Sequence, residues 1–409
     1  MPQSRSSAAI PPEAPAGSKE LDVVLFGATG FTGGLTADYL ARHVPDGCRW
    51  ALAGRNQAKL EAVRERLASV DPGLADLPLL LADVADEDSL AEVARRTRVV
   101  ITTVGPYLEH GEPLVAACAK AGTDYVDLTG EPEFVDRMYL AHHDEAVRTG
   151  ARIVHACGFD SIPHDLGALF TVKQLPEGLA LRVRGMVRAS GTFSGGTFAS
   201  ALTAFSRSGQ MRQAHAARRR QEPRPENRRV RSSAKRPHFD ALAGYWLVPL
   251  PTIDPLVVRR SAEALDRYGP DFTYSHYAAV KRLPVALGGI AAVGALALGA
   301  QVAPLRKLLI SRVPQGEGPS EERREKAWFC VRFIGEGGGR RVFTEVSGGD
   351  PGYTETAVML AESALCLAFD DDNPSTAGQV TTAVAMGDRL LERLVAAGIS
   401  FTVTDTEST

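Results

Sequence analysis

Short apolar runs alternate with segments of helical spacing over the first 160 residues. Six runs have the length of buried strands, and they are residues 22–27, 49–54, 78–83, 98–105, 124–130 and 152–158. Stretches between them, such as QAKLEAVRERLASV, place apolar residues three and four positions apart, as one face of a helix does. Strand and helix in regular alternation predict βαβ crossovers and a parallel sheet covered on both faces. We therefore expect an α/β fold in which residues 21–160 form a Rossmann-type doubly wound domain.

The pattern changes after residue 160. Residues 181–191, 272–280, 326–337 and 340–348 alternate polar positions with apolar or β-branched ones. This alternation is typical of strands in an antiparallel or mixed sheet. It predicts a second, α+β domain over residues 161–350. Helical segments follow within residues 353–398, and we expect them to close the fold by packing back on the first domain.

The first predicted strand runs into the loop GATGFTG, residues 27–33, and then into a helical segment. Glycine also marks ordinary tight turns, but between a strand and a helix such a loop is where a dinucleotide pyrophosphate binds. By analogy with that fingerprint, Gly27 permits the turn, Gly30 lets the backbone approach the phosphates, and Gly33 allows close packing of the helix. The other cofactor-binding candidates of the loop are Thr29, Phe31 and Thr32.

The second predicted strand ends in AGRN, and the residue at this point selects the dinucleotide. Enzymes that use NAD place Asp or Glu here to hold the ribose 2′-hydroxyl, whereas enzymes that use NADP offer a cation to the 2′-phosphate. Arg55 therefore predicts NADP, because its planar guanidinium suits a phosphate. The alternative is a solvent-exposed arginine at a loop start. Further cofactor contacts are expected where the third and fourth strands end, at Asp83, Thr103, Gly105 and Pro106.

Five motifs occur in order along the chain: GATGFTG, AGRN, TTVGPY, DYVDLTGE and HACGFDSIPHDLG. Together they resemble the saccharopine dehydrogenase-like oxidoreductases, and more closely the mycobacterial trans-acting enoyl reductases, over about residues 22–398. The resemblance implies an NADP-binding Rossmann domain and an α+β domain that covers the nicotinamide. It also implies reduction of the α,β double bond of a lipid- or polyketide-type enoyl thioester, in trans to a synthase. One position departs from the family pattern, since His164 stands where Ser is usual.

Candidates for the chemistry follow the fourth to sixth strands, because ligands of open parallel sheets bind beyond the carboxyl ends of the strands. They are Tyr107, Asp127, Glu131, Cys157, Asp160, Ser161 and His164. Tyr107 is a candidate proton donor to a developing enolate, or else a packed aromatic beside Pro106. Asp160 and His164 are the other catalytic candidates, although Ser and Asp at a helix start are also ordinary N-cap residues.

Residues 283–305 form an uncharged segment between Lys281-Arg282 and Arg306-Lys307. As a helix it would match a bilayer core of ~30 Å. Its many Ala and Gly residues disfavour insertion across a membrane. A helix on a membrane surface, a lining for an acyl chain and a buried core helix all stay open.

Residues 212–236 form a basic segment with ten Lys or Arg and two Glu. Its polarity and prolines predict a mobile, solvated loop. Its sign suits an acidic acyl carrier protein or anionic lipid head groups as partner. Because aromatic residues are not interleaved with the basic ones, we do not expect nucleic-acid binding.

Composition bounds the remaining questions. The chain has 409 residues, of which 44% are hydrophobic and 23% charged, as in a soluble globular enzyme. Its five cysteines form no C-x-x-C pair, so we expect a reducing cytoplasm and neither disulfides nor a metal site. Residues 1–20 are expected to be a disordered leader. Homo-oligomerisation stays open, as do two rival functions: reduction of an amino acid-derived imine, and a lipid-associated protein that binds nucleotide without catalysis.

Overall fold

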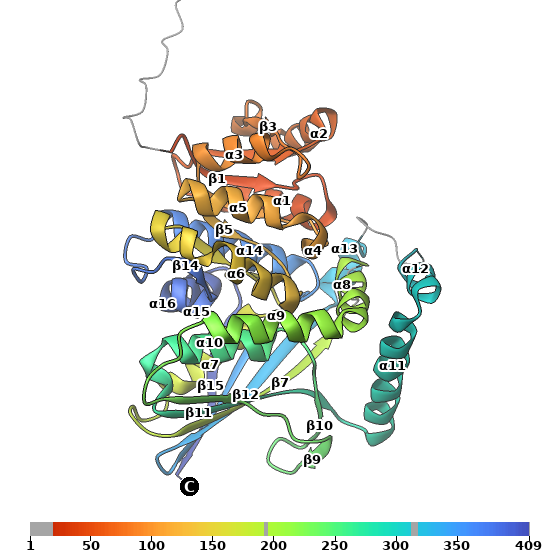
Figure 1. The fold of residues 1–409 in the computed structure, drawn as a ribbon, viewed down its shortest axis with the longest axis vertical. Helices are drawn as coiled ribbons and strands as arrows, with labels where there is room; N and C mark the ends of the chain where they lie inside the picture. Colours follow the sequence, from red (N-terminus) through yellow and green to blue (C-terminus); the bar gives the residue numbers. More distant parts are fainter. Residues whose placement is uncertain (1–18, 192–194, 312–317, 409) are drawn as a thin grey trace, which may run out of the picture.

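The first of two sheets lies in the upper part of the molecule (Figure 1), in a computed structural model that describes residues 19–191, 195–311 and 318–408. It is parallel throughout, with the strand order β14-β6-β5-β4-β1-β2-β3. The strands are β1 (Leu21–Phe26), β2 (Trp50–Gly54), β3 (Leu79–Leu81), β4 (Thr97–Thr102), β5 (Asp124–Val126), β6 (Arg152–Val154) and β14 (Gly378–Val380). Every residue of β1 and β2 is buried, as expected for central strands covered on both faces. The Rossmann-type prediction is confirmed.

The helices of this part begin and end at residues suited to the purpose. They are α1 (Phe31–His43), α2 (Gln57–Ala68), α3 (Glu87–Arg96), α4 (Tyr107–His110), α5 (Glu112–Ala121) and α6 (Pro132–Thr149), with a 3-10 turn at Pro72–Leu74. The side chain of Asn56 accepts from Lys59 N at the start of α2, and Asp86 does the same for α3. Left-handed glycines, Gly122 and Gly150, end α5 and α6.

The C-terminal region completes the first sheet. It contains α14 (Thr354–Phe369), α15 (Thr382–Ala385) and α16 (Gly387–Ala396). Helix α14 packs against α1, where Tyr39 Oη donates to Glu362 Oε1 at 2.6 Å. Strand β14 pairs with β6 as a seventh strand, which the sequence pattern did not predict because its residues, GQV, form no apolar run.

The second sheet is mixed and has eight strands. They are β7 (Leu181–Ser190), β8 (Arg229–Ser232), β9 (His238–Asp240), β10 (Tyr245–Pro249), β11 (Asp271–Val280), β12 (Trp328–Gly337), β13 (Arg340–Gly348) and β15 (Ser400–Ser408). Strand β11 runs parallel to β7 and β8, whereas the other pairs are antiparallel. Helices α7 (Ile162–Lys173) and α10 (Asp254–Ala264) pack on this sheet. One continuous apolar cluster runs from β1 through α7 to β12 and α14, so the two sheets share a core.

The basic segment is built into the fold, contrary to the prediction of a mobile loop. Most of it lies in α9 (Ser208–Gln221) and β8. Arg218 is 2% exposed, and its guanidinium lies 3.5 Å from Asp136 and 2.6 Å from Glu222. It also stacks over the ring of Tyr139 at 4.0 Å. Carboxylates on both sides of Arg218 therefore compensate its burial, and Asp136 is too distant in sequence to have revealed this.

The uncharged segment forms α11 (Leu283–Gln301), which leads into α12 (Ala303–Ser311). Figure 1 shows the two helices at the side of the molecule, and α11 contacts β10 and β11 of the second sheet. Both helices contact α8 (Gly195–Ser206). The remaining short elements are the helix α13 (Glu321–Glu325) and a 3-10 turn at Asp266–Tyr268. Helix α11 is long and apolar enough to cross a membrane, and 11% of its most apolar window is buried. A buried core helix is therefore the wrong description of this segment.

The described part of the chain begins just before β1. Residues 1–18 of the predicted leader lie outside the described residues, whereas Lys19 is fixed, because its Nζ donates to Ala121 O and Thr123 Oγ1 at 2.9 Å.

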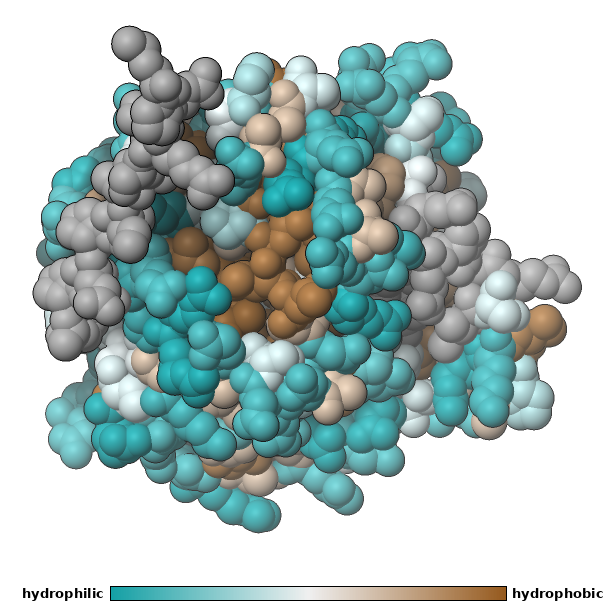
Figure 2. Space-filling view, turned by 90° about the horizontal axis from the view of Figure 1, so that it is seen from above, coloured by the Kyte–Doolittle hydropathy of each residue, from teal (hydrophilic) through white to brown (hydrophobic). Residues whose placement is uncertain are grey.

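Strand β3 ends the sheet at the top of the molecule and exposes Leu81. Seen from above, this end carries hydrophobic residues near its centre, surrounded by hydrophilic ones (Figure 2).

Candidate functional site

Two glycines of the loop after β1 are required by the packing of the chain itself. Gly27 has a φ of 96°, and a Cβ there would lie 2.7 Å from Thr103 Oγ1. A Cβ on Gly33 would lie 2.1 Å from Gly27 O. Both positions therefore exclude a side chain, because the turn and the first turn of α1 touch each other and the end of β4.

Gly30 has no such internal reason to be glycine. Its φ of −82° suits any residue, and a Cβ there would have its nearest neighbour, Gly27 O, at an ordinary 3.6 Å. It is the N-cap of α1, it is exposed like Thr29, and no side chain caps the helix. The start of α1 therefore has no side-chain cap beside an exposed stretch of backbone at Thr29 and Gly30, which fits the pyrophosphate of a dinucleotide.

The other loop candidates lie at the start of α1. Thr32 is half-buried, and its carbonyl accepts from Thr36 Oγ1 at 2.9 Å. The ring of Phe31 meets the edge of Tyr353 at 5.0 Å, so the C-terminal region helps to hold the loop.

Arg55 lies exposed directly after β2, next to the Asn56 that caps α2. It makes no hydrogen bond or ion pair within residues 19–191, 195–311 and 318–408, so its guanidinium is available to a ligand. Asp83 follows the neighbouring strand β3, and its Oδ1 accepts from Ala85 N at 3.0 Å. The two predicted cofactor residues thus end adjacent strands, since Gly54 pairs with Leu81.

The loop after β4 borders the glycine loop. Two hydrogen bonds hold Thr103 in position. Its N donates to Phe26 O and its Oγ1 donates to Gly27 O, both at 3.1 Å. Gly105 is exposed, and its peptide bond to Pro106 is cis. These three predicted residues therefore lie at the carboxyl edge of the sheet, beside the start of α1.

Tyr107 is buried, and its hydroxyl is fully engaged by the backbone. Its Oη donates to Thr102 O at 3.2 Å and accepts from Leu128 N at 3.1 Å. Burial, together with the nearby Asp127, raises its pKa well above the ordinary value. This arrangement favours the packed-aromatic alternative for Tyr107 over the role of proton donor.

Asp127 and Cys157 organise the loops after β5 and β6. One oxygen of Asp127 lies 2.6 Å from His155 Nδ1, and the other accepts from Thr129 N and Ala156 N at 3.0 and 2.9 Å. Cys157 is fully buried, and this burial raises the pKa of its thiol well above the ordinary value. Neither side chain is presented to a substrate.

Glu131 holds the start of α4. Its two oxygens accept from Tyr107 N at 3.2 Å and Leu108 N at 2.9 Å. Ser200 Oγ of α8 donates to the same carboxylate at 2.8 Å. Glu131 is therefore a positioning residue that connects the loop after β5 with α8.

Asp160 and His164 lie at the start of α7, and His164 belongs to a cluster that the sequence alone did not reveal. Ser161 is the N-cap of α7, so Asp160 lies just before this helix and His164 lies in its first turn. His164 Nδ1 lies 2.7 Å from Oδ1 of Asp254, the first residue of α10. His276 of β11 places its Nε2 3.7 Å from the other Asp254 oxygen. All three side chains of this His164–Asp254–His276 cluster are buried.

The sequence held one weak signal for His276. Phe272, Tyr274 and His276 alternate along β11 and are buried, so strand parity places His276 on the covered face. Asp254 has no such signal, because Asp before Pro is ordinary at a helix start.

Electrostatics separate Asp160 from its neighbours. Burial and then the charge of Asp254 raise the pKa of Asp160 to about 6, while His164 opposes the shift. Burial would raise the pKa of Asp254 as well, but His164 and His276 together hold it below the ordinary value. Burial lowers the pKa of His276 to about 4. Asp160 is thus a carboxylic acid that exchanges its proton near neutrality.

His164, Asp254 and His276 are also residue types that bind divalent metals, and their ligand atoms lie within 4.8 Å of one another. Two ligands bound at 2.0–2.1 Å to a tetrahedral ion would lie about 3.3 Å apart. The 2.7 Å between His164 Nδ1 and Asp254 Oδ1 is shorter than this, and it is an ion-pair distance without the geometry of a hydrogen bond. We therefore treat the cluster as an ion pair with a neighbouring imidazole.

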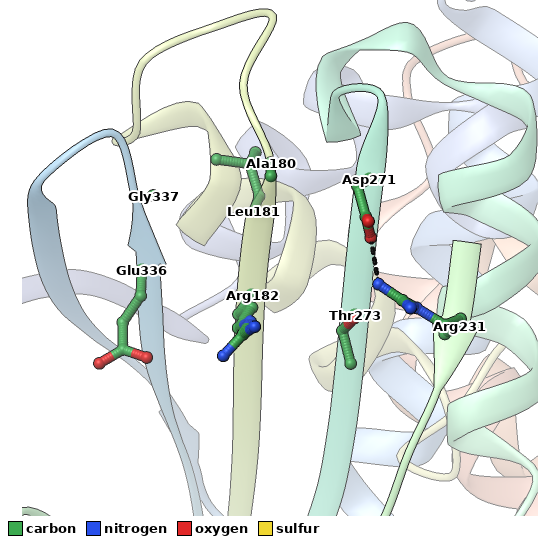
Figure 3. Close-up of a pocket in the computed structure, with 8 residues that line it drawn as sticks. All are labelled: Ala180, Leu181, Arg182, Arg231, Asp271, Thr273, Glu336 and Gly337. Carbon is green, nitrogen blue, oxygen red and sulfur yellow. Dashed lines mark hydrogen bonds and ion pairs between the residues drawn. The ribbon is translucent and has the colours of Figure 1, made fainter. Parts of the chain in front are cut away.

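A cavity of about 250 Å³ lies elsewhere, at one end of the second sheet (Figure 3). Figure 3 shows Arg182, Thr273 and Glu336 on adjacent strands, with Arg231 joined to Asp271 at 2.5 Å. It is smaller than the ~300–1,000 Å³ usual for ligand sites. It contains none of the predicted site residues, so we do not assign the substrate to it.

Known proteins share both the sequence and the fold. The profile described as saccharopine dehydrogenase NADP binding domain matches residues 23–154. A Mycobacterium ulcerans trans-acting enoyl reductase is 37% identical, over 94% of this chain and 98% of its own. A Mycobacterium tuberculosis protein, named as a putative trans-acting enoyl reductase, is 41% identical over 94% of this chain and 98% of its own. The chain belongs to the saccharopine dehydrogenase-like oxidoreductases. Its membership makes it an NAD(P)-binding oxidoreductase, which the open helix start at Gly30 fits.

The solved structures agree at the level of the fold. Apo saccharopine dehydrogenase from Saccharomyces cerevisiae is 13% identical, with a TM-score of 0.53 over 94% of this chain and 100% of its own. A saccharopine dehydrogenase-like protein thus combines a parallel nucleotide-binding sheet with a second, mixed sheet.

Proposed function

We propose that this protein is an NADPH-dependent enoyl reductase that acts in trans on a lipid- or polyketide-type enoyl thioester. The observation that carries the proposal is the position of Asp160. This partly exposed acid, with a pKa of about 6, follows β6 and lies beside the loop after β5, where a Cβ on Gly130 would be 3.2 Å from its Oδ2. That edge of the sheet is where the fold presents a nicotinamide. The names of the relatives support reduction of an enoyl group in trans.

The cofactor would be held by three parts of the chain. The amides around Gly30 receive the pyrophosphate, Arg55 receives the 2′-phosphate, and Asp83 lies at the next strand end. When bound, NADPH supplies a hydride to the β carbon of the enoyl thioester. The chain's own task is then to provide a proton for the α carbon.

Asp160 provides this proton. The carbon–carbon π bond breaks, the hydride forms one C–H bond, and the electron pair left on the α carbon takes the proton of Asp160. His164 acts on Asp160 through its charge, which opposes the rise in the pKa of Asp160, and its Nδ1 lies 2.7 Å from Asp254 Oδ1. Asp254 is then a positioning residue that fixes the ring of His164.

The test is turnover with deuterated NADPH and an enoyl thioester, followed by mass spectrometry of the product. We expect one deuterium at the β carbon and no cofactor oxidation when the thioester is omitted. Turnover of an amino acid-derived imine but not of the thioester would replace the proposal with a saccharopine-type reaction. Binding of NADPH without turnover of either substrate would leave a nucleotide-binding protein that is not an enzyme.

The exposed basic residues of the α9 region support an acyl carrier protein as substrate carrier. Arg219, Arg220 and Arg224 are exposed, whereas Arg218 holds the helix in place. We expect Arg219→Glu with Arg220→Glu to raise KM for a carrier-bound thioester and to leave a free thioester unaffected. Equal effects on both would remove the carrier from the proposal. Arg389→Glu, on the remote helix α16, is the matched control.

A further inference from the structure

Helix α11 presents large apolar side chains to solvent. Within it, Ala286 and Ala300 are the buried residues, so the helix meets the body of the protein through small side chains. At 100° per residue, Leu283, Leu287, Ile290 and Leu298 lie within an arc of ~80°, and all are exposed, Leu298 by 74%. A surface helix of a soluble protein has the opposite arrangement.

The ends of the apolar stretch are basic. Lys281 and Arg282 are exposed before it, and Lys307 is exposed after it. The sequence contains no Asp or Glu between residues 272 and 316. The surface that covers α11 should therefore be apolar within and anionic at its boundary, as a bilayer with acidic head groups is.

The attachment of α11 at both ends decides its orientation. Two residues separate the end of β11 from the start of α11, α12 contacts α8, and Gln301 Nε2 donates to Phe205 O at 2.7 Å. A spanning helix of this length, ~28 Å, would place these two ends on opposite sides of the membrane. Because both are held by one folded body (Figure 1), α11 can only lie along the membrane.

We propose that α11 and α12 form an arm that docks this protein onto an anionic lipid bilayer, with α11 lying in the interface of one leaflet. Charge complementarity favours lipid over a second copy of the chain, because two such arms would bring their basic ends together. Val285 and Val293 are exposed outside the main arc as well, so apolar side chains face solvent on more than one side of α11.

The arm is connected to the candidate site. Helix α8 contacts both α11 and α12, and its Ser200 is hydrogen-bonded to Glu131, which holds the loop at Tyr107. Resting on the proposed function, this connection would allow a lipid-bound acyl substrate to approach the site from the membrane. Docking itself does not depend on that function.

The experiment is flotation of the full-length protein with vesicles of phosphatidylcholine, with and without phosphatidylglycerol, in the absence of substrate. We expect the protein to float with the anionic vesicles and less with the neutral ones. Leu287→Glu with Ile290→Glu should lower the bound-to-free ratio by about tenfold or more, since charge on the lipid side opposes insertion. Lys281→Gln with Arg282→Gln should reduce only the preference for anionic vesicles.

The matched control is Val147→Glu, at an exposed valine of α6, which should float as the wild type does. Nucleotide binding of each variant reports whether it is folded. Failure of the wild type to float with either vesicle overturns the proposal, as does equal flotation of the α11 variants. A lipid-free dimer that the α11 substitutions dissociate also overturns it, because the arm would then be an interface between copies. Flotation together with inactivity on thioesters would reject the enzyme proposal alone.

Discussion

His164 Nδ1 lies 2.7 Å from Asp254 Oδ1, although the two side chains come from different helices, α7 and α10. Both side chains and His276 are buried, and α10, which carries Asp254, packs on α7 and on β11. The pair therefore couples the entry of α7, at the edge of the nucleotide-binding sheet, to the second sheet.

Substitution of Asp160 tests the proton donor. Because its pKa is raised to about 6, the acid form predominates below that pH, and kcat/KM should fall as the pH rises through about 6. Asp160→Asn should lower kcat by about 10²- to 10⁴-fold and remove this pH dependence. The pH–rate profile is the measurement, with unchanged NADPH affinity as evidence of folding. An unchanged profile in the variant would assign the proton to another group.

His276 should make the protein sensitive to acid. Its pKa is lowered to about 4 in the folded state, so between pH 6.5 and 4 the unfolded chain binds a proton that the native state does not. Acidification through this window should therefore cost about 3 kcal/mol of stability through His276. Asp160 acts in the opposite sense, because its raised pKa makes the native state bind the extra proton.

Urea unfolding at several pH values would measure the effect of His276. The readout is the difference between the wild type and His276→Gln, which should lose less stability than the wild type on acidification. His110→Gln, at a partly exposed site, serves as control. Parallel curves for wild type and His276→Gln would contradict the assignment.

Two glycines of the loop should respond to alanine in different ways. Gly33→Ala forces a Cβ to within 2.1 Å of Gly27 O, so we expect a loss of several kcal/mol in the free energy of unfolding, or failure to fold. Gly30→Ala meets no clash and should cost about 1 kcal/mol or less as an N-cap change. It should nevertheless weaken NADPH binding at least about tenfold, because the methyl group stands where a phosphate would approach. Calorimetry of both variants, with and without nucleotide, separates the two effects.

Arg55→Ala tests the choice of cofactor. Loss of a charge-assisted bond to the 2′-phosphate should weaken NADPH by ~1 to 3 kcal/mol and leave NADH almost unaffected. Titration calorimetry with both nucleotides is the measurement, and Arg95→Ala, exposed on α3, is the control. Equal losses for NADPH and NADH would show that Arg55 does not recognise the phosphate.

Arg218 should matter for stability in a way that its neighbour does not. Arg218→Met leaves Glu222 without its buried partner and removes one of the buried arginines that face Asp136, so we expect a loss of about 3 to 5 kcal/mol. Asp136 keeps its ion pair with Arg260, which limits the loss. Arg219→Met changes an exposed side chain and should stay within about 0.5 kcal/mol. Denaturant unfolding measures the free energy of unfolding of both variants. Equally small losses of this free energy in the two variants would indicate that α9 is mobile.

The sequence by itself determined the features that are local. Six strands of the first sheet follow from apolar runs, and the roles of Gly27 and Gly33 follow from the strand–loop–helix order, because turn chemistry and periodicity act over a few neighbouring residues. Strand β14 was not predicted because its sequence, GQV, contains a single large apolar residue and so forms no apolar run.

Tertiary structure alone decided the rest. Which carboxylate meets His164 or Arg218 depends on helices that approach from distant parts of the chain, and no local pattern encodes such a pairing. The hydrogen bonds of the Tyr107 hydroxyl to the backbone of Thr102 and Leu128, and the exposure of α11, likewise depend on the tertiary structure. An apolar helix reads alike in sequence whether it is buried or exposed, and only its neighbours in space decide whether its leucines meet protein or water.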